Sequence, residues 1–579
     1  MRKSVILLFA VLATAACSGV KDGDYTFHIL TTNDVHGTYF DSTYVDDRTQ
    51  NSMLAAYYYV DSVRTAAGRE NVILLDAGDF LQGNNAAYYY NYVETDVPHV
   101  FSRMVDYMDY DAVIWGNHDV ETGHPVYDRI SREIEGYGIP FLGGNAIRED
   151  NGEPYFPTYT MLNKNGVKVA VLGYNNANIK AWLDESIWSG MTFESLIPLV
   201  QQDVDRIIAK EKPQLVIAAV HSGTGDGSGE ILESQGLDLY NSLKGVDVVV
   251  CAHDHRPFVT DDGTKALLNS GSHSRNLGHA TVNLTVENGK VVSKSVEAGL
   301  IPIRKEKADP EMRKAFQKDY EAVKAFTLKE VGELTADLNL SDAFAGMSDY
   351  LNLIHTVSLG CSPAQISVAA PLTQRGVIKA GKLVFNDLFT LYQYENQLFV
   401  IKMSGQEVKD FLEASYDLWI RTASGPSDRV LNIRNTPDTR TGLERWSFVN
   451  ASFNFDSMAG INYTVDVTKP AGSRVSITTL ADGTPFSPDE TYNVAMTSYR
   501  ASGGGGTLDK IGIDTDRIDE RVVKKYPEIR DMIYEYLKEH GSIDPAVIGD
   551  PAVIGHWEFV PSAVAGPAIS RDMRLVFGE

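Results

Sequence analysis

The chain has 579 residues, with 77 acidic against 52 basic side chains and a formal net charge of −25. Its 43% hydrophobic and 22% charged residues are ordinary for a globular protein, which excludes disorder, collagen and coiled coil. The acidity argues against a protein that binds a nucleic-acid polymer by its phosphates, and three cysteines are too few for a disulfide framework. At roughly 100–200 residues per domain, the length predicts about two to four domains.

The first segment has the pattern of an export signal. Arg2 and Lys3 precede an apolar run over residues 5–16, which is too short to span a bilayer. We therefore expect a signal peptide over residues 1–16. No other apolar run approaches the ~20 residues that a transmembrane helix needs, so the body of the protein is expected to be soluble and exported.

The signal run ends in Thr14-Ala15-Ala16-Cys17. This resembles the lipobox of bacterial lipoproteins, with Thr14 in place of the usual leucine. The resemblance implies acylation of Cys17, an acidic tether over residues 17–25, and a protein of the periplasm or cell surface that is lipid-anchored to the bacterial outer membrane. The alternative is an ordinary cleaved signal with an incidental cysteine.

The first half of the chain predicts a layered α/β fold. Short apolar runs suit strands that are buried on both faces, and they lie at residues 27–32, 72–75, 112–115, 169–172, 215–220 and 246–251. Between them lie helix-like stretches at residues 54–67, 125–137 and 196–210.

Five of these runs lead into segments rich in Asp, Asn and His, at residues 33–37, 76–79, 116–119, 221–223 and 252–255. In sheets of this kind, ligands bind outside the carboxyl ends of the strands, so five polar segments should meet at one edge. A single histidine after a strand is usually structural. Repeated imidazole, carboxylate and carboxamide groups instead predict a site for two divalent ions such as Mn, Zn, Fe or Co.

The five segments resemble the signature of the calcineurin-like metallophosphoesterases: Asp-x-His, Gly-Asp, Gly-Asn-His-Asp/Glu, His and Gly-His-x-His. Ala252 stands where the last block usually has Gly. The resemblance implies a four-layer αββα sandwich over residues 26–303. It also implies one metal held by Asp34, His36, Asp79 and His255, and a second held by Asp79, Asn117, His221 and His253, with the Asp79 carboxylate bridging.

The same resemblance implies that His118 stabilises the transition state or protonates the leaving oxygen. An acidic partner three residues on orients it, and here that residue is Glu121 rather than the more usual Asp or Asn. Asp76 is expected to be a structural hydrogen-bonding residue. Arg275 is a candidate phosphate clamp, with a plain surface arginine as the favoured interpretation.

The composition of the chain changes after Leu300. A charged stretch over residues 304–329, broken at Asp309-Pro310, predicts a helix that joins two domains, although packing on the first domain is the alternative. Residues 330–579 then form a second unit, expected to recognise the substrate. It resembles the C-terminal domain of the 5′-nucleotidase family, which implies a smaller α+β domain, in its segments 368–371, 386–389, 391–396, 401–408, 460–463 and 498–504.

In that family two aromatic rings hold the nucleobase, and Phe453 and Tyr499 stand at the matching places. Base–aromatic stacking is worth about 1–3 kcal/mol per base and tolerates any base. The alternative is that either ring belongs to the core. The glycine run after Tyr499 is expected to let the backbone approach a ligand closely.

Two branches of the family fit the sequence. One hydrolyses 2′,3′-cyclic nucleotides and 3′-nucleotides, and the other acts on nucleoside 5′-monophosphates and UDP-sugars. Val-Ala-Ala-Pro at residues 368–371 favours the first branch, whereas Arg375 falls at a phosphate-binding position of the second. In both, a water activated by two metals attacks phosphorus, and the domains are expected to close on the substrate. A different class, a non-catalytic nucleotide-binding surface lipoprotein, is the other alternative.

One short repeat remains. Asp-Pro-Ala-Val-Ile-Gly occurs at residues 544–549 and again at residues 550–555. It is too short for a solenoid repeat, so we expect an extended surface segment with no assigned function.

Overall fold

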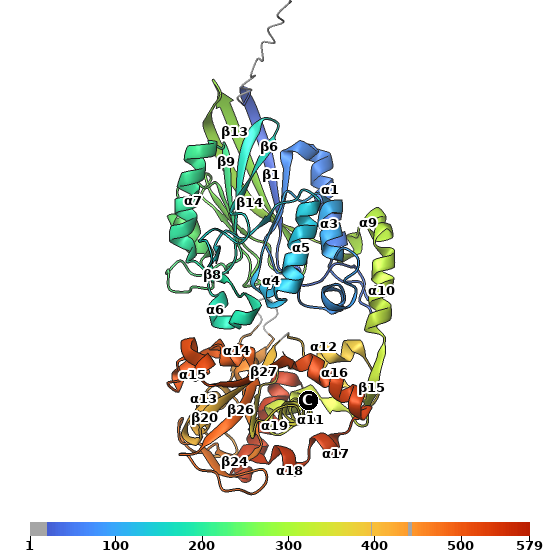
Figure 1. The fold of residues 1–579 in the computed structure, drawn as a ribbon, viewed down its shortest axis with the longest axis vertical. Helices are drawn as coiled ribbons and strands as arrows, with labels where there is room; N and C mark the ends of the chain where they lie inside the picture. The colour runs from blue at the N-terminus through green and yellow to red at the C-terminus, as the bar shows by residue number, and fades with distance from the viewer. Residues whose placement is uncertain (1–19, 395, 438–442, 579) are drawn as a thin grey trace, which may run out of the picture.

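The computed structural model describes residues 20–394, 396–437 and 443–578, so the predicted signal segment and Cys17 lie outside the described residues. Figure 1 shows an N-terminal and a C-terminal domain, joined along one side by the helices α9 (Pro310–Ala315) and α10 (Gln317–Thr327). None of the helices in the described residues is long and apolar enough to cross a membrane.

The N-terminal domain contains two six-stranded sheets. The first has the order β14-β13-β1-β2-β3-β4, in which β1 to β4 run parallel and β13 pairs antiparallel with β1. Its strands are β1 (Gly23–Thr32), β2 (Val72–Asp76), β3 (Ala112–Ile114), β4 (Phe141–Leu142), β13 (Asn276–Glu287) and β14 (Lys290–Pro302). The second has the order β11-β12-β10-β9-β7-β6, with β6 (Tyr159–Lys164), β7 (Val167–Tyr174), β9 (Leu215–Val220), β10 (Val248–Val250), β11 (Phe258–Asp261) and β12 (Ala266–Asn269).

The alternation of side chains along these strands creates the layers. Ile29 and Leu75 of the first sheet pack against Val171 and Ile217 of the second in one buried cluster. The outer face of the first sheet is covered by α1 (Met53–Ala67), α3 (Val100–Met108) and α5 (His124–Gly136), and that of the second by α7 (Leu196–Glu211) and α8 (Gly236–Ser242). The predicted four-layer sandwich is confirmed, and each predicted strand and helix of this domain is present within a few residues.

The C-terminal domain is built on a mixed sheet of order β23-β17-β26-β20-β27. Its strands are β17 (Ile366–Ala369), β20 (Gln397–Ser404), β23 (Ser457–Ala459), β26 (Thr491–Thr497) and β27 (Val522–Glu528). One core cluster includes residues of α13 (Gly405–Trp419) and α19 (Ser562–Phe577), and another includes residues of α11 (Asp349–Gly360) and α16 (Ile529–His540). The predicted α+β class is confirmed.

The connecting stretch differs in detail from a single joining helix broken at Asp309-Pro310. Asp309 caps α9, since its side chain accepts a hydrogen bond from the Met312 amide, and Pro310 occupies the first helical position, where its missing N–H costs nothing. The break falls at Phe316, between α9 and α10. Tyr320 of α10 donates to the Thr43 carbonyl oxygen over 3.1 Å, so this helix packs on the N-terminal domain.

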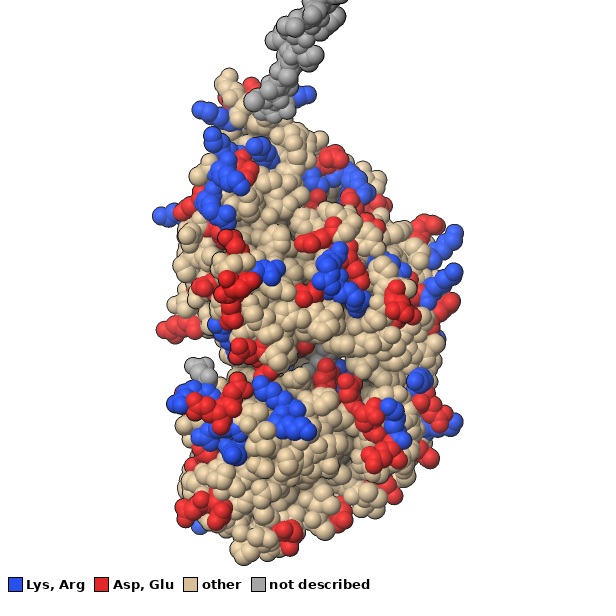
Figure 2. All heavy atoms as spheres, viewed as in Figure 1, with Lys and Arg blue, Asp and Glu red and all other residues tan. Residues whose placement is uncertain are grey.

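The domains touch at α2 (Asn85–Tyr88), whose end contacts the C-terminal domain. The Tyr88 hydroxyl donates to Asp531 over 2.9 Å, and its ring lies 5.3 Å from that of Phe385. Asn85 donates to the side-chain oxygen of Asn386 over 2.8 Å. On the face drawn in Figure 2 a groove runs between the two domains.

The tandem repeat is not extended, so that prediction is wrong. Each copy forms one helical turn, α17 (Pro545–Ile548) and α18 (Pro551–Ile554). Asp544 and Asp550 cap these turns by accepting from the amides two residues on, over 2.9 and 3.0 Å. Asp is a common N-cap residue and Pro is favoured at the first helical position, so each Asp-Pro pair starts a helical turn. We expected an extended segment because that capping signal was not considered.

Candidate metal centre and substrate cavity

The polar segments after β1, β2, β3, β9 and β10 meet at one edge of the two sheets. Asp34, His36 and His255 form one group of candidate ligands, and Asp79, His221 and His253 form another, with the ligand atoms of each group within 4.8 Å of one another. Asn117 joins the second group, because its Oδ1 lies 2.8 Å from His253 Nδ1. All seven predicted ligands therefore come together in the structure.

The backbone at these residues is held in an unusual conformation. A positive φ angle is uncommon outside glycine and costs on the order of 1–3 kcal/mol per residue, so it persists only where the surroundings fix it. Five of the seven ligands have one: Asp34 (48°), His36 (45°), Asp79 (61°), His253 (72°) and His255 (57°). The loops are thus bent so that short segments turn their side chains toward a common point.

Two glycines of the motifs are required by close approach. Gly78 has φ of 97°, and a Cβ there would lie 2.7 Å from His221 Nδ1. A Cβ on Gly116 would lie 2.2 Å from Asp79 Oδ1. No larger residue fits at either position without moving a ligand.

Asp119 fixes the Asp79 loop, a role not expected from the sequence. Its fully buried carboxylate accepts from four backbone amides, those of Asp79, Phe80, Leu81 and Gly116, over 2.8–3.0 Å. The signal was its place directly after Asn117-His118. Asp76, expected to be structural, accepts from the Thr32 hydroxyl over 2.6 Å and from the Gly78 amide over 3.0 Å.

The electrostatics keep several donors in the form that binds a cation. Burial lowers the pKa of His253 to about 3, with a contribution from the nearby His221. Burial also holds the pKa of His36 well below its usual range. Burial by itself raises the pKa of Asp79, but His221 and His118 outweigh it and hold that pKa well below its usual range. His36 and His253 are thus neutral and Asp79 is charged, which are the forms that metal binding needs. Burial by itself lowers the pKa of His221, but Asp79 outweighs it and raises that pKa to about 9, so His221 must lose a proton when it binds a cation.

The residues fit two divalent cations. Asp79 Oδ2 and His221 Nε2 lie 3.1 Å apart, yet both atoms are buried and neither makes a hydrogen bond of acceptable geometry to a described residue. His36 Nε2 and His255 Nε2 lie 2.9 Å apart. Buried polar atoms without partners are costly, and imidazole, carboxylate and carboxamide donors suit ions such as Mn²⁺, Zn²⁺ or Fe²⁺.

His118 and Glu121 lie side by side at the edge of this centre. His118 Nδ1 is 2.9 Å from Glu121 Oε2, and Gln82 donates to the same oxygen over 2.5 Å. Burial by itself lowers the pKa of His118, but the charges of Glu121 and Asp79 outweigh it and raise that pKa to about 10. The structure thus brings together the two residues assigned to proton transfer, whose roles stay predictions.

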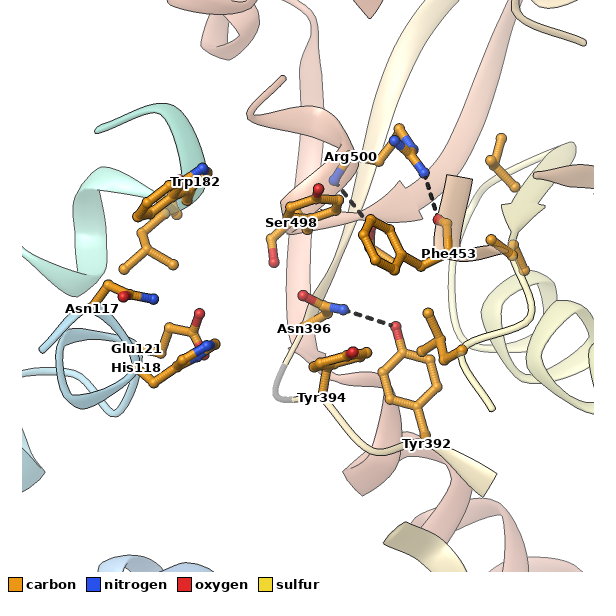
Figure 3. A pocket seen from close by; sticks show the side chains of 18 of the residues that line it. Asn117, His118, Glu121, Trp182, Tyr392, Tyr394, Asn396, Phe453, Ser498 and Arg500 are labelled. Carbon is orange, nitrogen blue, oxygen red and sulfur yellow. Dashed lines mark hydrogen bonds and ion pairs between the residues drawn. The ribbon is translucent and has the colours of Figure 1, made fainter. Parts of the chain in front are cut away.

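A cavity of about 260 Å³ connects the metal centre to the C-terminal domain. Figure 3 shows its two sides, with Asn117, His118, Glu121 and Trp182 facing Tyr394, Asn396, Phe453 and Ser498. Tyr499, His253 and residues 368–370 of the Val-Ala-Ala-Pro segment also line it. The cavity therefore belongs to both domains, and neither domain alone forms it.

Phe453 and Tyr499, the two rings assigned to the nucleobase, both line this cavity, and that role stays a prediction. Their ring centroids lie 6.3 Å apart and the ring planes meet at 85°, an edge-to-face arrangement rather than a parallel sandwich. The glycine run after Tyr499 also serves the protein itself, because a Cβ on Gly504 would lie 2.5 Å from the Tyr499 ring and one on Gly505 would lie 2.3 Å from Arg500.

Arg375 is not brought to the cavity. Its guanidinium donates to the Val576 carbonyl oxygen and lies 5.4 Å from the Phe577 ring centroid. In the described part of the chain, Arg500 is the one lysine or arginine that lines the cavity. Arg500 is already engaged, since it pairs with Asp456 over 2.9 Å and donates to the Phe453 carbonyl oxygen over 2.9 Å.

Three other cavity residues were not singled out from the sequence. Tyr394 and Asn396 lie in a segment that carried the family resemblance, so their motif was a signal. Trp182 belongs to none of the motifs. Only its position in space reveals it.

Comparisons with known proteins agree with these observations. The profile of the calcineurin-like phosphoesterases matches residues 27–257, and that of the 5′-nucleotidase C-terminal domain matches residues 329–510. The chain is 26% identical, over 99% of its length, to the trifunctional nucleotide phosphoesterase protein YfkN of Bacillus subtilis, of which it spans 41%.

Two further similarities cover nearly complete proteins. The chain is 23% identical to the 2′,3′-cyclic-nucleotide 2′-phosphodiesterase/3′-nucleotidase of Haemophilus influenzae, over 96% of this chain and 90% of that protein. In structure it is similar to a Staphylococcus aureus protein crystallised with alpha-ketoglutarate. The TM-score is 0.74 at 20% identity, over 92% of this chain and 99% of that one, a likeness of fold.

Proposed function

Because this chain belongs to the family that joins a calcineurin-like phosphoesterase domain to a 5′-nucleotidase C-terminal domain, we propose that it is a metal-dependent nucleotide hydrolase. One observation carries the proposal: a single cavity runs from the candidate metal ligands Asn117 and His253 to the aromatic rings of Phe453 and Tyr499. A nucleotide whose base is held by these rings would place its phosphate beside the metal ligands.

Among nucleotides, we propose 2′,3′-cyclic nucleotides and 3′-nucleotides as the substrates. The Haemophilus influenzae relative bears that name and matches over most of both chains. Residues 368–370, part of the segment that favours this branch, line the cavity, and Arg375, the residue that favours the 5′-nucleotidase branch, does not. Arg500 is engaged with Asp456, so the C-terminal side offers rings and neutral groups, which suit a nucleoside rather than a second phosphate.

The chemistry divides among the residues as follows. When bound, two divalent cations activate a water molecule and neutralise charge on the phosphoryl oxygens. Asp34, His36, Asp79 and His255 would hold one cation, and Asp79, Asn117, His221 and His253 the other.

His118 moves the proton. Glu121 pairs with its Nδ1 and orients the ring, which leaves Nε2 to donate to the leaving oxygen. Phe453 and Tyr499 hold the base and exclude water from their side of the cavity. Since the two sides of the cavity belong to different domains, exchange of substrate and product is expected to require their separation.

Phosphate release from 2′,3′-cyclic AMP (with a coupled phosphatase), 3′-AMP and 5′-AMP tests the proposal, in Mn²⁺ and in EDTA. Metal-dependent turnover of the first two is the expected result. Preference for 5′-AMP would move the activity to the 5′-nucleotidase branch. No turnover by protein that retains bound metal would leave the non-catalytic nucleotide-binding alternative.

We also propose export and a lipid anchor at Cys17. Support comes from the sequence of residues 2–17 alone. In cells given labelled palmitate, the wild-type protein is expected to incorporate label and the Cys17→Ala variant to incorporate none. An unlabelled, shortened wild-type protein would point to an ordinary cleaved signal.

A further inference from the structure

The segment from α6 (Ile179–Trp182) through η3 (Glu185–Ile187) brings part of the N-terminal domain to the nucleoside side of the cavity. Trp182, Leu183, Asp184 and Ile187 of this segment all line the cavity. The segment comes from neither the metal motifs nor the C-terminal domain. It forms a third part of the wall.

Trp182 and its neighbour Trp188 lie in different surroundings. Trp188 is 7% exposed, and its indole N–H donates to the Leu183 carbonyl oxygen over 3.0 Å, as expected of a structural tryptophan. Trp182 is half-buried and lines the cavity, and its indole N–H has no acceptor among the described residues. One face of Trp182 stacks on His253, with ring centroids 5.1 Å apart and planes 22° apart.

Trp182 also lies on the same surface as the rings assigned to the base. Trp182, Phe453 and Tyr499 together line the cavity and a neighbouring pocket of about 600 Å³. Since Phe453 and Tyr499 meet edge to face rather than as a parallel pair, they do not by themselves supply two opposed stacking faces. Trp182 supplies an aromatic surface from the opposite domain, as Figure 3 shows.

An ion pair between the domains fixes the segment. Asp184 is 6% exposed, and one carboxylate oxygen accepts from the Ser186 amide over 3.1 Å while the other pairs with Lys525 of β27. Lys525 also contacts Asp519 over 3.1 Å. The Asp184–Lys525 pair therefore holds the Trp182 segment against the C-terminal domain when the cavity is formed.

We infer that Trp182 is a specificity-determining residue, which contacts the nucleoside from the phosphoesterase side, and that Asp184 and Lys525 are positioning residues for it. The inference rests on the proposed nucleotide substrate and adds a contact from the metal-binding domain. It predicts that recognition of the base weakens when either domain loses its aromatic surface.

Kinetics with and without a base provide the first test. Trp182→Ala is expected to raise KM for 3′-AMP by roughly 10-fold, within the range for loss of one base–aromatic contact. Because Trp182 also stacks on the candidate metal ligand His253, both substrates should lose what that contact contributes. The loss of kcat/KM should be greater for 3′-AMP than for glycerol 2-phosphate, an alkyl phosphate without base or ribose, by about 5-fold or more. Trp188→Phe, which keeps a ring in the same segment, is the matched control and should leave the ratio of the two substrates unchanged.

Fluorescence provides a readout apart from turnover. Adenosine should alter the tryptophan emission of the wild-type protein and of Trp188→Phe, and most of that change should be lost in Trp182→Phe. Lys525→Met should raise KM for 3′-AMP with little change in kcat, and Lys525→Arg should restore it.

An adenosine response that persists in Trp182→Phe, or a loss in Trp182→Ala that is equal for both substrates, would overturn this inference alone. A wild-type protein that cleaves 3′-AMP no better than glycerol 2-phosphate and shows no adenosine response would overturn it together with the proposed function.

Discussion

The two halves of the substrate cavity are built in different ways. The metal half comes from five short segments, each directly after a strand, and five of its seven ligands sit at positive φ in loops fixed by groups such as Asp119. The nucleoside half comes from dispersed segments of the C-terminal domain plus Trp182, and its rings meet edge to face. One half is charged and its loops are held by backbone hydrogen bonds, and the other is mainly aromatic.

This difference teaches that the two halves set different kinetic quantities. In the proposed function the metal half contacts the reacting phosphorus, so damage there should lower kcat for every phosphate ester. The nucleoside half would contact a part of the substrate that does not react, so damage there should raise KM, and only for substrates with a base. If variants of the two halves changed kcat and KM in the same way, the two halves would not have separate roles.

The largest effect is expected at Asp79, the residue predicted to bridge the metals. Asp79→Asn should lower kcat by more than about 100-fold for 3′-AMP and glycerol 2-phosphate alike, because loss of even an outer partner of a metal ligand typically costs 10–100-fold. Metal content by mass spectrometry should fall with activity. Asp262→Asn, in an exposed turn, is the control and should retain both. Full metal content with full activity would contradict the bridging assignment.

The same contrast explains what could be predicted from the sequence. Asp34, Asp79 and His253 each lie two or three residues past a buried strand, so the strands predicted that they would meet at one edge of the sheets. Their assignment as ligands came from the resemblance to the calcineurin-like metallophosphoesterases. The layered α/β class followed from apolar runs buried on both faces, and the four-layer sandwich followed from the family resemblance. Trp182 has no such local signal, since its place depends on α6 and on Lys525, more than 300 residues away in the chain.

For Phe453, Tyr499 and Arg375 the sequence predicted only part of what the structure shows. Phe453 and Tyr499 were located through motifs, but their angle of 85° depends on side-chain packing that no motif encodes. Arg375 shares its spacing with a phosphate-binding position, yet the C-terminal helix α19 supplies it with Val576 and Phe577 as partners. Spacing identifies a residue type, and tertiary packing decides where its side chain points.

A somewhat smaller effect is expected at His118 and Glu121. His118→Asn should lower kcat for 3′-AMP by about 100-fold or more, the usual range for a general acid. Glu121→Gln should lower it by about 10-fold, because the Gln side-chain oxygen can still accept from His118 Nδ1 while the charge that raises the His118 pKa is lost. With p-nitrophenyl phosphate, whose leaving group needs no proton, both losses should shrink. Equal losses for the two substrates would assign His118 to the phosphoryl group instead of the leaving oxygen.

Effects on the nucleoside side should appear in KM. Phe453→Ala and Tyr499→Ala are each expected to raise KM for 3′-AMP by roughly 5- to 100-fold, from about 1–3 kcal/mol per stacked base. Neither should change kcat/KM for glycerol 2-phosphate by more than about 2-fold. Arg375→Ala, distant from the cavity in the described chain, should change neither substrate measurably. A large KM effect of Arg375→Ala would return that arginine to the phosphate site.

The smallest effect concerns the ion pair that joins the two halves. Burial by itself raises the pKa of Asp184, but hydrogen bonds from Lys525 and Ser186 outweigh it and hold that pKa below its usual value. A carboxyl whose folded pKa is depressed stabilises the fold at pH values above its unfolded pKa, about 3.9, and that contribution disappears as pH falls through the folded pKa. Asp184→Asn should therefore lower the thermal midpoint by about 1–3 °C at pH 7, and the gap should narrow toward pH 3.

Lys525→Met supplies the check on this assignment. If Asp184 acts through Lys525, the double variant Asp184→Asn, Lys525→Met should be no less stable than Lys525→Met alone at pH 7, because the second change then removes nothing further. Asn at position 184 still accepts from the Ser186 amide, so capping of η3 is preserved. A gap between Asp184→Asn and wild type that stays constant from pH 7 to pH 3 would mean that the residue acts through packing.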